Sequence, residues 1–344
     1  MDWFETLTGF AESPGEAGAA RARQRLQVHG QRMLSLANGR EFGIGRLELV
    51  PMHALRSRAL AGPAVPGLRQ VHLVQGNVRA FHALPAYSGA LFQVASQFNL
   101  LEMVGPEVTP EQGVARYAGD PTQGPACAIA AGAATIYRNY LAPVGGQTGQ
   151  THDCQLDAFA PLGAALAQAV HKPAASLWDM QNGYALFKPG AVALLSAHLQ
   201  TLDEAALDAL RAQLCIGLHW DVEVTDAATA PGPLVSQAFC SALPVAYHRG
   251  TARDAPWAPL ATLVLQAAYE ATLWAAVANA QRGGSRTVLL TMLGGGAFGN
   301  APAWIEAAVE HALARTAGYG LDVAIVSFQA PTPEQRRWVQ SLGV

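Results

Sequence analysis

A glycine-rich run near the C-terminal end constrains the fold more than any other feature of the chain. Its residues, Gly294-Gly295-Gly296-Ala297-Phe298-Gly299, satisfy the pattern G-x-G-x-x-G. They follow an apolar, strand-like segment at 287–293 and precede a helix that Asn300 caps and Pro302 opens. Glycines there let the backbone approach a ligand, and free N–H groups with the helix dipole attract phosphate. The run therefore predicts an α/β fold with an anion-binding loop.

A dinucleotide-binding Rossmann domain is the obvious α/β candidate, but the position of the loop disfavours it. The Rossmann loop follows the first strand of its domain, whereas only about 45 residues remain after Gly299. The acidic residue expected at the end of the next strand is missing, because Ser327, Phe328 and Gln329 stand there. We expect phosphate binding without a Rossmann domain, with a glycine turn that binds nothing as the alternative.

The composition allows a large core and excludes several classes of protein. Of 344 residues, 51% are hydrophobic and 14% charged, which is not the composition of a disordered chain. The net charge is −3 and no basic block is present, so we expect no nucleic acid as partner. The four cysteines are widely spaced and suit buried thiols in a reducing compartment better than disulfides or zinc. With no apparent membrane span or signal peptide, we expect a cytoplasmic protein with no membrane and no metal.

The pattern along the chain predicts an N-terminal region followed by an α/β body. A hairpin is expected between Met33 and Leu49, turning at Asn38-Gly39. Short apolar runs alternate with helices from about residue 70 onward, which is typical of an α/β sheet. A helix is expected at 126–141 after Pro125, and a half-buried strand at 215–225 from its alternation.

The C-terminal third carries the clearest elements. We expect a long buried helix at 259–280, strands at 287–293 and 321–328, and a helix between the two strands. The strands should be neighbours in one sheet, because a strand–helix–strand unit of this size makes a crossover connection. Glu270 lies within the long apolar helix and would need a partner if buried, so we interpret it as a core salt bridge.

Several of these segments together resemble the macrodomain family, in which a strand, helix, strand, glycine loop and helix close the fold. The matching segments are the helix at 263–273, the strand at 287–293, the loop at 296–302, the Gly-Asp-Ile-like stretch at 73–78, the Asn-Ala-Ala-Asn-like strand end at 94–99 and the first glycine loop at 123–129. The sequences at 98–103 and 124–135 are similar to those of a divergent, MavL-type branch of the family, whose members remove ADP-ribose from arginine on ubiquitin.

The resemblance implies a three-layer α/β/α macrodomain-like mixed sheet with two additions. Residues 1–67 would form an N-terminal extension packed on the body, and residues 68–344 the ADP-ribose-binding domain. A mid-chain insertion would occupy about 142–215. Asn77 stands where the family has an adenine-binding Asp, and Pro125 interrupts the first glycine loop.

The same resemblance implies the site. Glu102 or Asp120 would orient or deprotonate the attacking water, and Asn99 would hold the distal ribose; a solvated loop acid is the structural alternative for each carboxylate. The ligand-binding residues would be Asn77, Phe98, Gln123, Gly124, Gly294, Gly295, Gly296, Ala297, Phe298, Gly299 and Asn300. Asp221, Glu223, Asp226 and His219 match no metal signature, so we expect a solvent face there.

The function implied is a hydrolase that removes ADP-ribose from modified protein side chains, with arginine on ubiquitin as the first candidate. ADP-ribose would be the ligand and product, the ADP-ribosylated protein the partner, and no cofactor would be needed. A module that binds ADP-ribose without cleaving it is the alternative, and an NAD-dependent oxidoreductase is a weaker one. The fold cannot choose among them, because function resides in the site.

Overall fold

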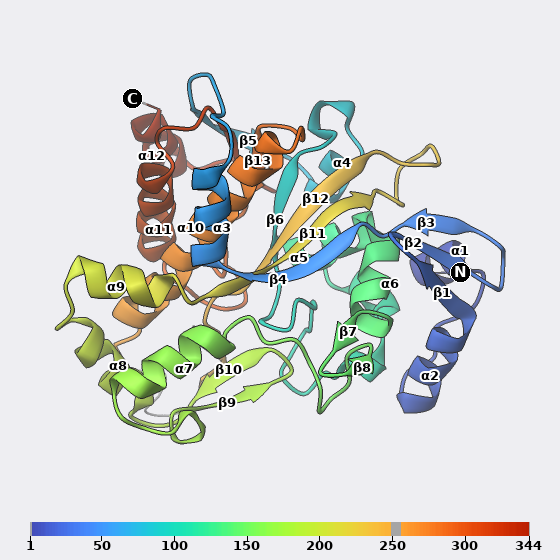
Figure 1. The fold of residues 1–344 in the computed structure, drawn as a ribbon, viewed down its shortest axis with the longest axis horizontal. Helices are drawn as coiled ribbons and strands as arrows, with labels where there is room; N and C mark the ends of the chain where they lie inside the picture. Colours follow the sequence, from blue (N-terminus) through green and yellow to red (C-terminus); the bar gives the residue numbers. More distant parts are fainter. Residues whose placement is uncertain (1, 249–255, 344) are drawn as a thin grey trace.

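The computed structural model describes residues 2–248 and 256–343 and is organised around a seven-stranded mixed sheet (Figure 1). In spatial order its strands are β4 (Arg46–Pro51), β11 (Cys215–Glu223), β12 (Leu234–Cys240), β6 (Leu91–Ala95), β13 (Thr287–Leu290), β14 (Asp322–Ser327) and β5 (Gln70–Gln75). The five strands from β12 to β5 run parallel, whereas β11 is antiparallel to both its neighbours. The predicted pairing of β13 with β14 is confirmed.

Helices cover both faces of this sheet, so the predicted three-layer α/β/α arrangement is confirmed (Figure 1). One face carries α3 (Met52–Ala61), α10 (Ala258–Gln281), α11 (Pro302–Arg315) and α12 (Pro333–Leu342); the other carries α4 (Val78–His82), α5 (Gln123–Ala130) and α6 (Gly132–Tyr140). By length and hydropathy α10 could cross a membrane, but 89% of its most apolar window is buried inside the protein. It packs against α11 and α3 as the central helix of the core.

The N-terminal segment contributes both a separate subdomain and part of the main sheet. Its helices α1 (Trp3–Thr8) and α2 (Glu16–Arg25) and a three-stranded sheet of β1 (Leu26–His29), β2 (Arg32–Ser35) and β3 (Glu41–Gly43) share an apolar cluster with α6. The next segment supplies β4, which pairs with β11, and α3, which packs on α10.

The segment between α6 and β11 folds into a layer of its own. It contains the short hairpin β7 (Pro143–Val144) and β8 (Gln147–Thr148), the helices α7 (Ala160–Ala169), α8 (Ala191–Leu199) and α9 (Glu204–Arg211), and the hairpin β9 (Trp178–Gln181) and β10 (Tyr184–Phe187). Figure 1 shows this layer at one end of the sheet, with α8 and α9 reaching α10.

Three local predictions need correction. The turn at Asn38-Gly39 joins β2 to β3, but Leu49 belongs to β4 in the main sheet, because a second turn at Gly45 redirects the chain. Strand β11 is buried on both faces rather than half-buried, since α6 covers its polar side. The helix expected at 126–141 breaks at Ala131 (ψ 57°), after which the Gly132 N–H donates to the Thr225 hydroxyl.

Candidate functional site

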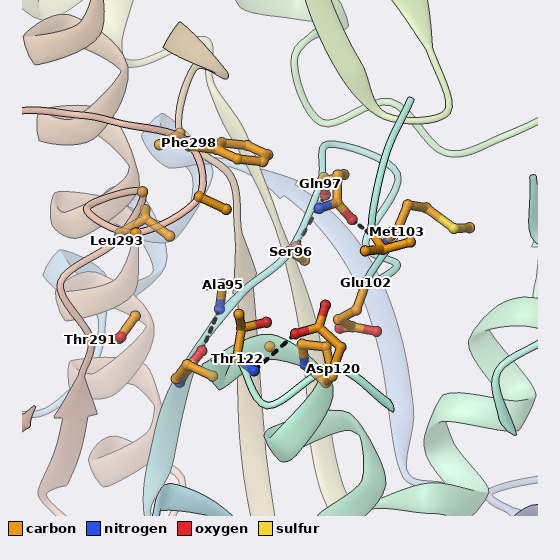
Figure 2. A pocket seen from close by; sticks show the side chains of 18 of the residues that line it. Ala95, Ser96, Gln97, Glu102, Met103, Asp120, Thr122, Thr291, Leu293 and Phe298 are labelled. Atoms are coloured by element: carbon orange, nitrogen blue, oxygen red, sulfur yellow. Dashed lines mark hydrogen bonds between the residues drawn. The ribbon is translucent and has the colours of Figure 1, made fainter. Parts of the chain in front are cut away.

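A pocket of about 430 Å³ opens at the carboxyl ends of three neighbouring parallel strands, β12, β6 and β13 (Figure 2). Ligands of open α/β sheets bind at this edge, because the loops that leave the strands meet there. The lining comes from residues 95–97 and 102–104 after β6, residues 119–125 around the start of α5, and the glycine loop after β13. Tyr184, Tyr247 and Ala242 complete it.

The glycine loop is shaped by its glycines and by Asn300. Gly294 has φ +73°, and a Cβ atom there would lie 2.5 Å from that of Ala242, so only glycine fits. The Asn300 side chain is buried and donates from Nδ2 to the carbonyls of Leu243 (2.9 Å) and Gly294 (3.3 Å). Asn300 therefore holds the loop against the strand after β12 and does not line the pocket.

The exposed half of the loop offers backbone donors. Within the described chain, the N–H groups of Gly296, Ala297 and Phe298 make no hydrogen bond, and all three residues line the pocket. Consecutive free N–H groups in a glycine turn form a concavity that binds anions. A Cβ atom at Gly296 would meet nothing within 4 Å, whereas one at Gly295 would point toward Ile305. Gly295 and Gly299, both predicted ligand residues, lie outside the lining.

The start of α5 supplies a second set of donors from the opposite wall. The Thr122 side chain does not cap this helix, and the N–H groups of Gln123 and Gly124 have no partner among the described residues. The Gln123 side chain is not free, because it accepts from the Ala95 N–H (2.8 Å) and donates to the Gln93 carbonyl (2.8 Å). The Gln123 side chain therefore holds α5 against β6, and only the backbone N–H of Gln123 is available to a ligand. Gly124 is required, since a Cβ atom would lie 1.9 Å from the Ala95 carbonyl oxygen.

Glu102 is the most unusual side chain of the pocket. It is only 4% exposed, its Oε1 lies 3.5 Å from Nη2 of Arg138, and its Oε2 has no hydrogen-bond partner among residues 2–248 and 256–343. Burial raises the pKa of Glu102 to about 7, although Arg138 and the Tyr117 hydroxyl lower it. A carboxyl group with a pKa near neutral pH and one free oxygen in a cavity is suited to general acid–base chemistry.

Asp120 is the second carboxylate of the pocket. It is half-buried, and its Oδ1 accepts a hydrogen bond from the Thr122 N–H at 2.9 Å. The two predicted acids thus come together at one cavity (Figure 2). Lysine, arginine and histidine are absent from the described lining, so anion binding there depends on backbone N–H groups.

Besides Gly295, Gly299 and Asn300, three further predicted residues lie outside the pocket lining: Phe98, Asn99 and Asn77. Asn99 is fully buried: its Nδ2 donates to Gln155 (2.8 Å) and its Oδ1 accepts from the Leu101 N–H (3.1 Å), so it shapes a turn instead of holding ribose. Phe98 points into the core, with its ring 5.0 Å from that of Phe159. The Asn99 and Phe98 predictions are therefore corrected, because the chain turns inward after β6.

Asn77 is exposed at the end of β5 and caps α4, accepting from the Arg79 N–H at 2.9 Å. It lies outside the pocket lining. Phe328, with 73% of its surface exposed, follows the neighbouring strand β14, and Gly76 donates its N–H to the Ser327 carbonyl. The side chains of Asn77 and Phe328 therefore lie at the carboxyl edge of the sheet, where the glycine loop also lies.

The sequence predicted Phe298 as a ligand-binding residue but did not point to the two tyrosines that pack against it at the pocket. Tyr184, Tyr247 and Phe298 come from β10, the segment after β12 and the glycine loop, and their ring centroids lie 5.1–5.6 Å apart. The Tyr184 hydroxyl donates to the Met103 carbonyl at 2.5 Å. No motif marks Tyr184, because only the folding of the inserted layer brings it to the sheet.

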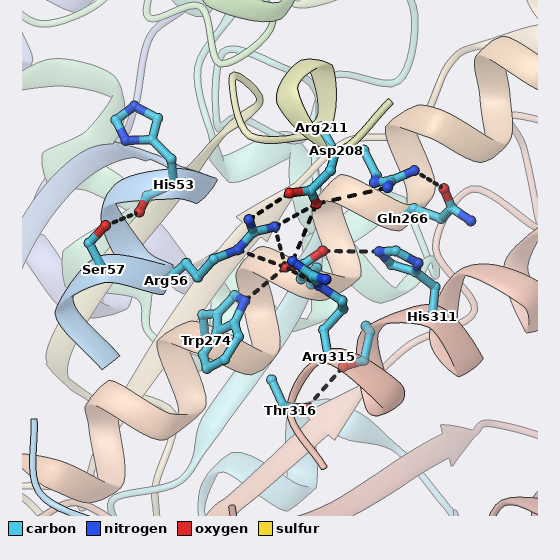
Figure 3. A network of polar contacts seen from close by, with 12 residues as sticks. His53, Arg56, Ser57, Asp208, Arg211, Gln266, Trp274, His311, Arg315 and Thr316 are labelled. Atoms are coloured by element: carbon cyan, nitrogen blue, oxygen red, sulfur yellow. Dashed lines mark hydrogen bonds and ion pairs between the residues drawn. The ribbon is translucent and has the colours of Figure 1, made fainter. Parts of the chain in front are cut away.

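A second buried carboxylate, Glu270 on α10, lies on the other face of the sheet in a network of charges. Figure 3 shows its partners Arg56, Trp274 and His311. It accepts from Arg56 Nη2 (2.7 Å), Trp274 Nε1 (2.9 Å) and His311 Nε2 (3.0 Å). The network joins α3, α9, α10 and α11 through Arg56 and Asp208. The predicted salt bridge of Glu270 is confirmed.

The acidic strand β11 is not the solvent face that its pattern predicts. His219 and Glu223 are buried, while Asp221 and Asp226 pair with Arg282 (2.5 Å) and Arg79 (2.6 Å). Asp221, Glu223 and Asp226 thus each bond to a different partner: Arg282, the Gly43 N–H and Arg79, respectively. Within residues 2–248 and 256–343, no three His, Cys, Asp or Glu side chains are grouped as metal ligands.

No protein-family model and no curated protein matches the chain. Among solved structures, poly(ADP-ribose) glycohydrolase from Deinococcus radiodurans in complex with ADP-ribose is similar at a TM-score of 0.44 and 13% identity, over 95% of this chain and 98% of that one. Poly(ADP-ribose) glycohydrolase from Thermomonospora curvata gives a TM-score of 0.44 and 13% identity, over 94% and 97%. A likeness this distant leaves the activity to be argued from the pocket itself.

Proposed function

We propose that this protein is a hydrolase that releases ADP-ribose from modified protein side chains. The observation that carries the proposal is Glu102, a buried carboxyl group with an unpartnered oxygen in a cavity. The same cavity is walled by the free N–H groups of the glycine loop and of the start of α5. An anion cradle beside a carboxyl group of near-neutral pKa suits the cleavage of a phosphate-bearing glycoside.

In this proposal the diphosphate binds the backbone N–H groups of Gly296, Ala297 and Phe298 and faces those of α5. The distal ribose then reaches Glu102. Ionised Glu102 takes a proton from a water molecule whose oxygen bonds to the anomeric carbon. The bond from that carbon to the side-chain nitrogen breaks, and the leaving nitrogen takes up the proton that Glu102 accepted, which returns Glu102 to its ionised form. A positioned base of this kind contributes about 10²–10⁴ in rate.

Arginine is the proposed linkage, with ubiquitin as the first candidate protein. An ADP-ribosylated guanidinium is a cation, and the described pocket lining holds Glu102 and Asp120 but no basic side chain. A cationic leaving group beside carboxylates is favoured by charge, whereas a carboxyl-linked or hydroxyl-linked one gains nothing from them. The family resemblance adds the choice of ubiquitin.

The adenine end is proposed to lie over Phe328, with the Asn77 amide beside it. Phe328 follows β14 and Asn77 follows β5, the two strands that continue the sheet beyond β13 and its glycine loop. An exposed aromatic ring stacks a base without further specificity, and an amide adds a hydrogen bond.

The deciding experiment offers the protein arginine-ADP-ribosylated ubiquitin, with glutamate-linked and serine-linked substrates as comparisons, and follows free ADP-ribose by chromatography. Release from the arginine-linked substrate, lost in Glu102→Gln, is expected. Calorimetric binding of ADP-ribose with no release from any substrate would favour the module that only binds ADP-ribose. Tighter binding of NADH than of ADP-ribose would favour the oxidoreductase and overturn the proposal.

A further inference from the structure

Arg138 is a fully buried arginine directly behind Glu102, and the proposed reaction gives it no part. It lies on α6, with its side chain 0% exposed. Its Nε donates to the Leu100 carbonyl at 3.0 Å, and its Nη2 lies 3.3 Å from the Thr135 hydroxyl. Its guanidinium carbon sits 3.8 Å from the centre of the Phe239 ring. Burying a guanidinium is costly, and a buried charge is retained where it is paired.

The contacts of Arg138 converge on the loop that carries Glu102. The Leu100 carbonyl lies two residues before Glu102, and Leu100 itself has a left-handed backbone (φ 63°) that needs support. The weak 3.5 Å contact engages Oε1 of Glu102 and leaves Oε2 without a partner among the described residues. One cation thus acts on both the backbone and the carboxylate.

We propose that Arg138 is a positioning residue for Glu102, fixing the loop that bears the carboxylate and holding one oxygen so that the other faces the substrate. This role rests on the proposed function, because positioning matters only if Glu102 acts on a ligand. The ring of Phe239 supports the guanidinium from β12 and keeps it from turning away.

The other groups around Glu102 leave Arg138 as its cationic partner. The Tyr117 hydroxyl, from the 3₁₀ helix at 115–119, accepts from the Glu102 N–H at 3.1 Å, and the Glu102 charge also acts on the Cys127 thiol of α5; burial raises the pKa of both groups. His219 on β11 lies near Arg138, and burial lowers its pKa, so it stays neutral. Asp120 lines the pocket side. Removing the Arg138 charge would thus raise the pKa of Glu102 further.

The test measures the protonation of Glu102 directly, by ¹³C NMR of protein labelled at the glutamate side-chain carboxyl carbons. The Glu102 signal is the one that disappears in Glu102→Gln. Arg138→Met should raise its titration midpoint by roughly one pH unit or more, because a nearby opposite charge lowers a carboxyl pKa by about 1–3. Arg211→Met is the matched control: Arg211 is equally buried but pairs with Glu204 and Gln266 away from the pocket.

A second variant separates geometry from charge and serves if Arg138→Met does not fold. Arg138→Lys keeps the cation but loses the planar fork that reaches both Leu100 and Glu102. Its kcat should fall roughly 10- to 100-fold with KM within about threefold, because misplacing a catalytic group lowers turnover more than binding. Arg211→Lys should leave both constants unchanged.

The two hypotheses fail in different ways. An unchanged Glu102 midpoint in Arg138→Met, or in its absence a wild-type kcat in Arg138→Lys, would overturn the positioning role whatever the protein hydrolyses. A moved midpoint in a protein that releases no ADP-ribose would instead overturn the proposed function, with the hold of Arg138 on Glu102 still supported.

Discussion

Glu102 and Glu270 are two buried glutamates on opposite faces of the same sheet, and their surroundings differ in one respect. Glu270 is saturated, with three hydrogen-bond donors within 3.0 Å. Burial alone would raise its pKa, but His311, Trp274 and Arg56 together lower the pKa of Glu270 to about 2. Glu102 has one contact at 3.5 Å and one oxygen without a partner, and burial raises its pKa.

The comparison teaches that burial by itself does not distinguish a structural carboxylate from a reactive one. A buried charge whose hydrogen bonds are all satisfied holds elements together, here α3, α9, α10 and α11. A buried carboxyl group whose oxygens do not all accept hydrogen bonds has a raised pKa. If it lies beside a cavity, its lone pairs remain available to a ligand. The variants below test whether Glu102 acts in catalysis and Glu270 in stability.

The largest expected effect separates the two glutamates by activity. Glu102→Gln keeps the shape of the side chain but removes the base, so ADP-ribose release should fall about 10²–10⁴-fold. Its affinity for ADP-ribose, measured by calorimetry, should change little. Glu270→Gln should keep the activity per folded molecule. Equal losses in both variants would show that the loss comes from the fold and not from chemistry.

The reverse contrast is expected in stability. Glu270→Gln removes the buried charge of the network and leaves Asp208 as the one carboxylate that pairs with Arg56 among the described residues, so unfolding by denaturant at pH 7 should cost about 3 kcal/mol less than for the wild type. The pKa of Glu270 is lowered on folding, so its contribution is present above the ordinary value of 4.5 and is lost as pH falls toward 2. The two proteins should therefore converge in stability at the acidic end. A difference independent of pH would contradict the charge network as its source.

The anion cradle next to Glu102 can be closed without disturbing the fold. Gly296→Leu puts a side chain into open space at the pocket, and ADP-ribose affinity should fall roughly 100-fold, about 2.7 kcal/mol. Gly318→Leu is the control, since its Cβ atom also meets nothing within 4 Å but the residue lies after α11, away from the pocket. Wild-type affinity in Gly296→Leu would place the ligand elsewhere.

Asp120 provides an intermediate case between the two glutamates. It is half-buried and already accepts the Thr122 N–H, so its charge is better screened than that of Glu102. Asp120→Asn keeps that hydrogen bond, and release of ADP-ribose should slow only about tenfold, or about 1.4 kcal/mol. A loss larger than that of Glu102→Gln would reverse the assignment of the two acids.

The smallest effect is expected at the adenine end, far from either glutamate. Phe328→Ala should weaken ADP-ribose binding about fivefold, at the low end for base stacking on an exposed ring, and leave turnover at saturation unchanged. Leu68→Ala removes a similarly exposed apolar side chain near the opposite, amino end of β5 and should change nothing. Unchanged binding in Phe328→Ala would remove this part of the site.

The local elements and the position of the glycine loop between a strand and a helix could be predicted from the sequence. The apolar runs at β13 and β14, the long helix α10 and the glycine run between β13 and α11 were all predictable, because period, turn residues and helix signals are local properties. It also brought Glu102 and Asp120 forward as candidates, through the resemblance of the segments around them.

The surroundings of each candidate side chain, in contrast, depend on the tertiary structure. Asn99 is three residues from Glu102, yet one side chain shapes a turn and the other faces the cavity. Arg138, 36 positions from Glu102, contacts that residue, and Tyr184, from the layer between α6 and β11, lines the pocket, only because distant segments pack there. Burial and hydrogen-bond partners are set by such long-range contacts, and these set the pKa of a carboxyl group, so residue type and spacing alone could not give the pKa of either Glu102 or Glu270.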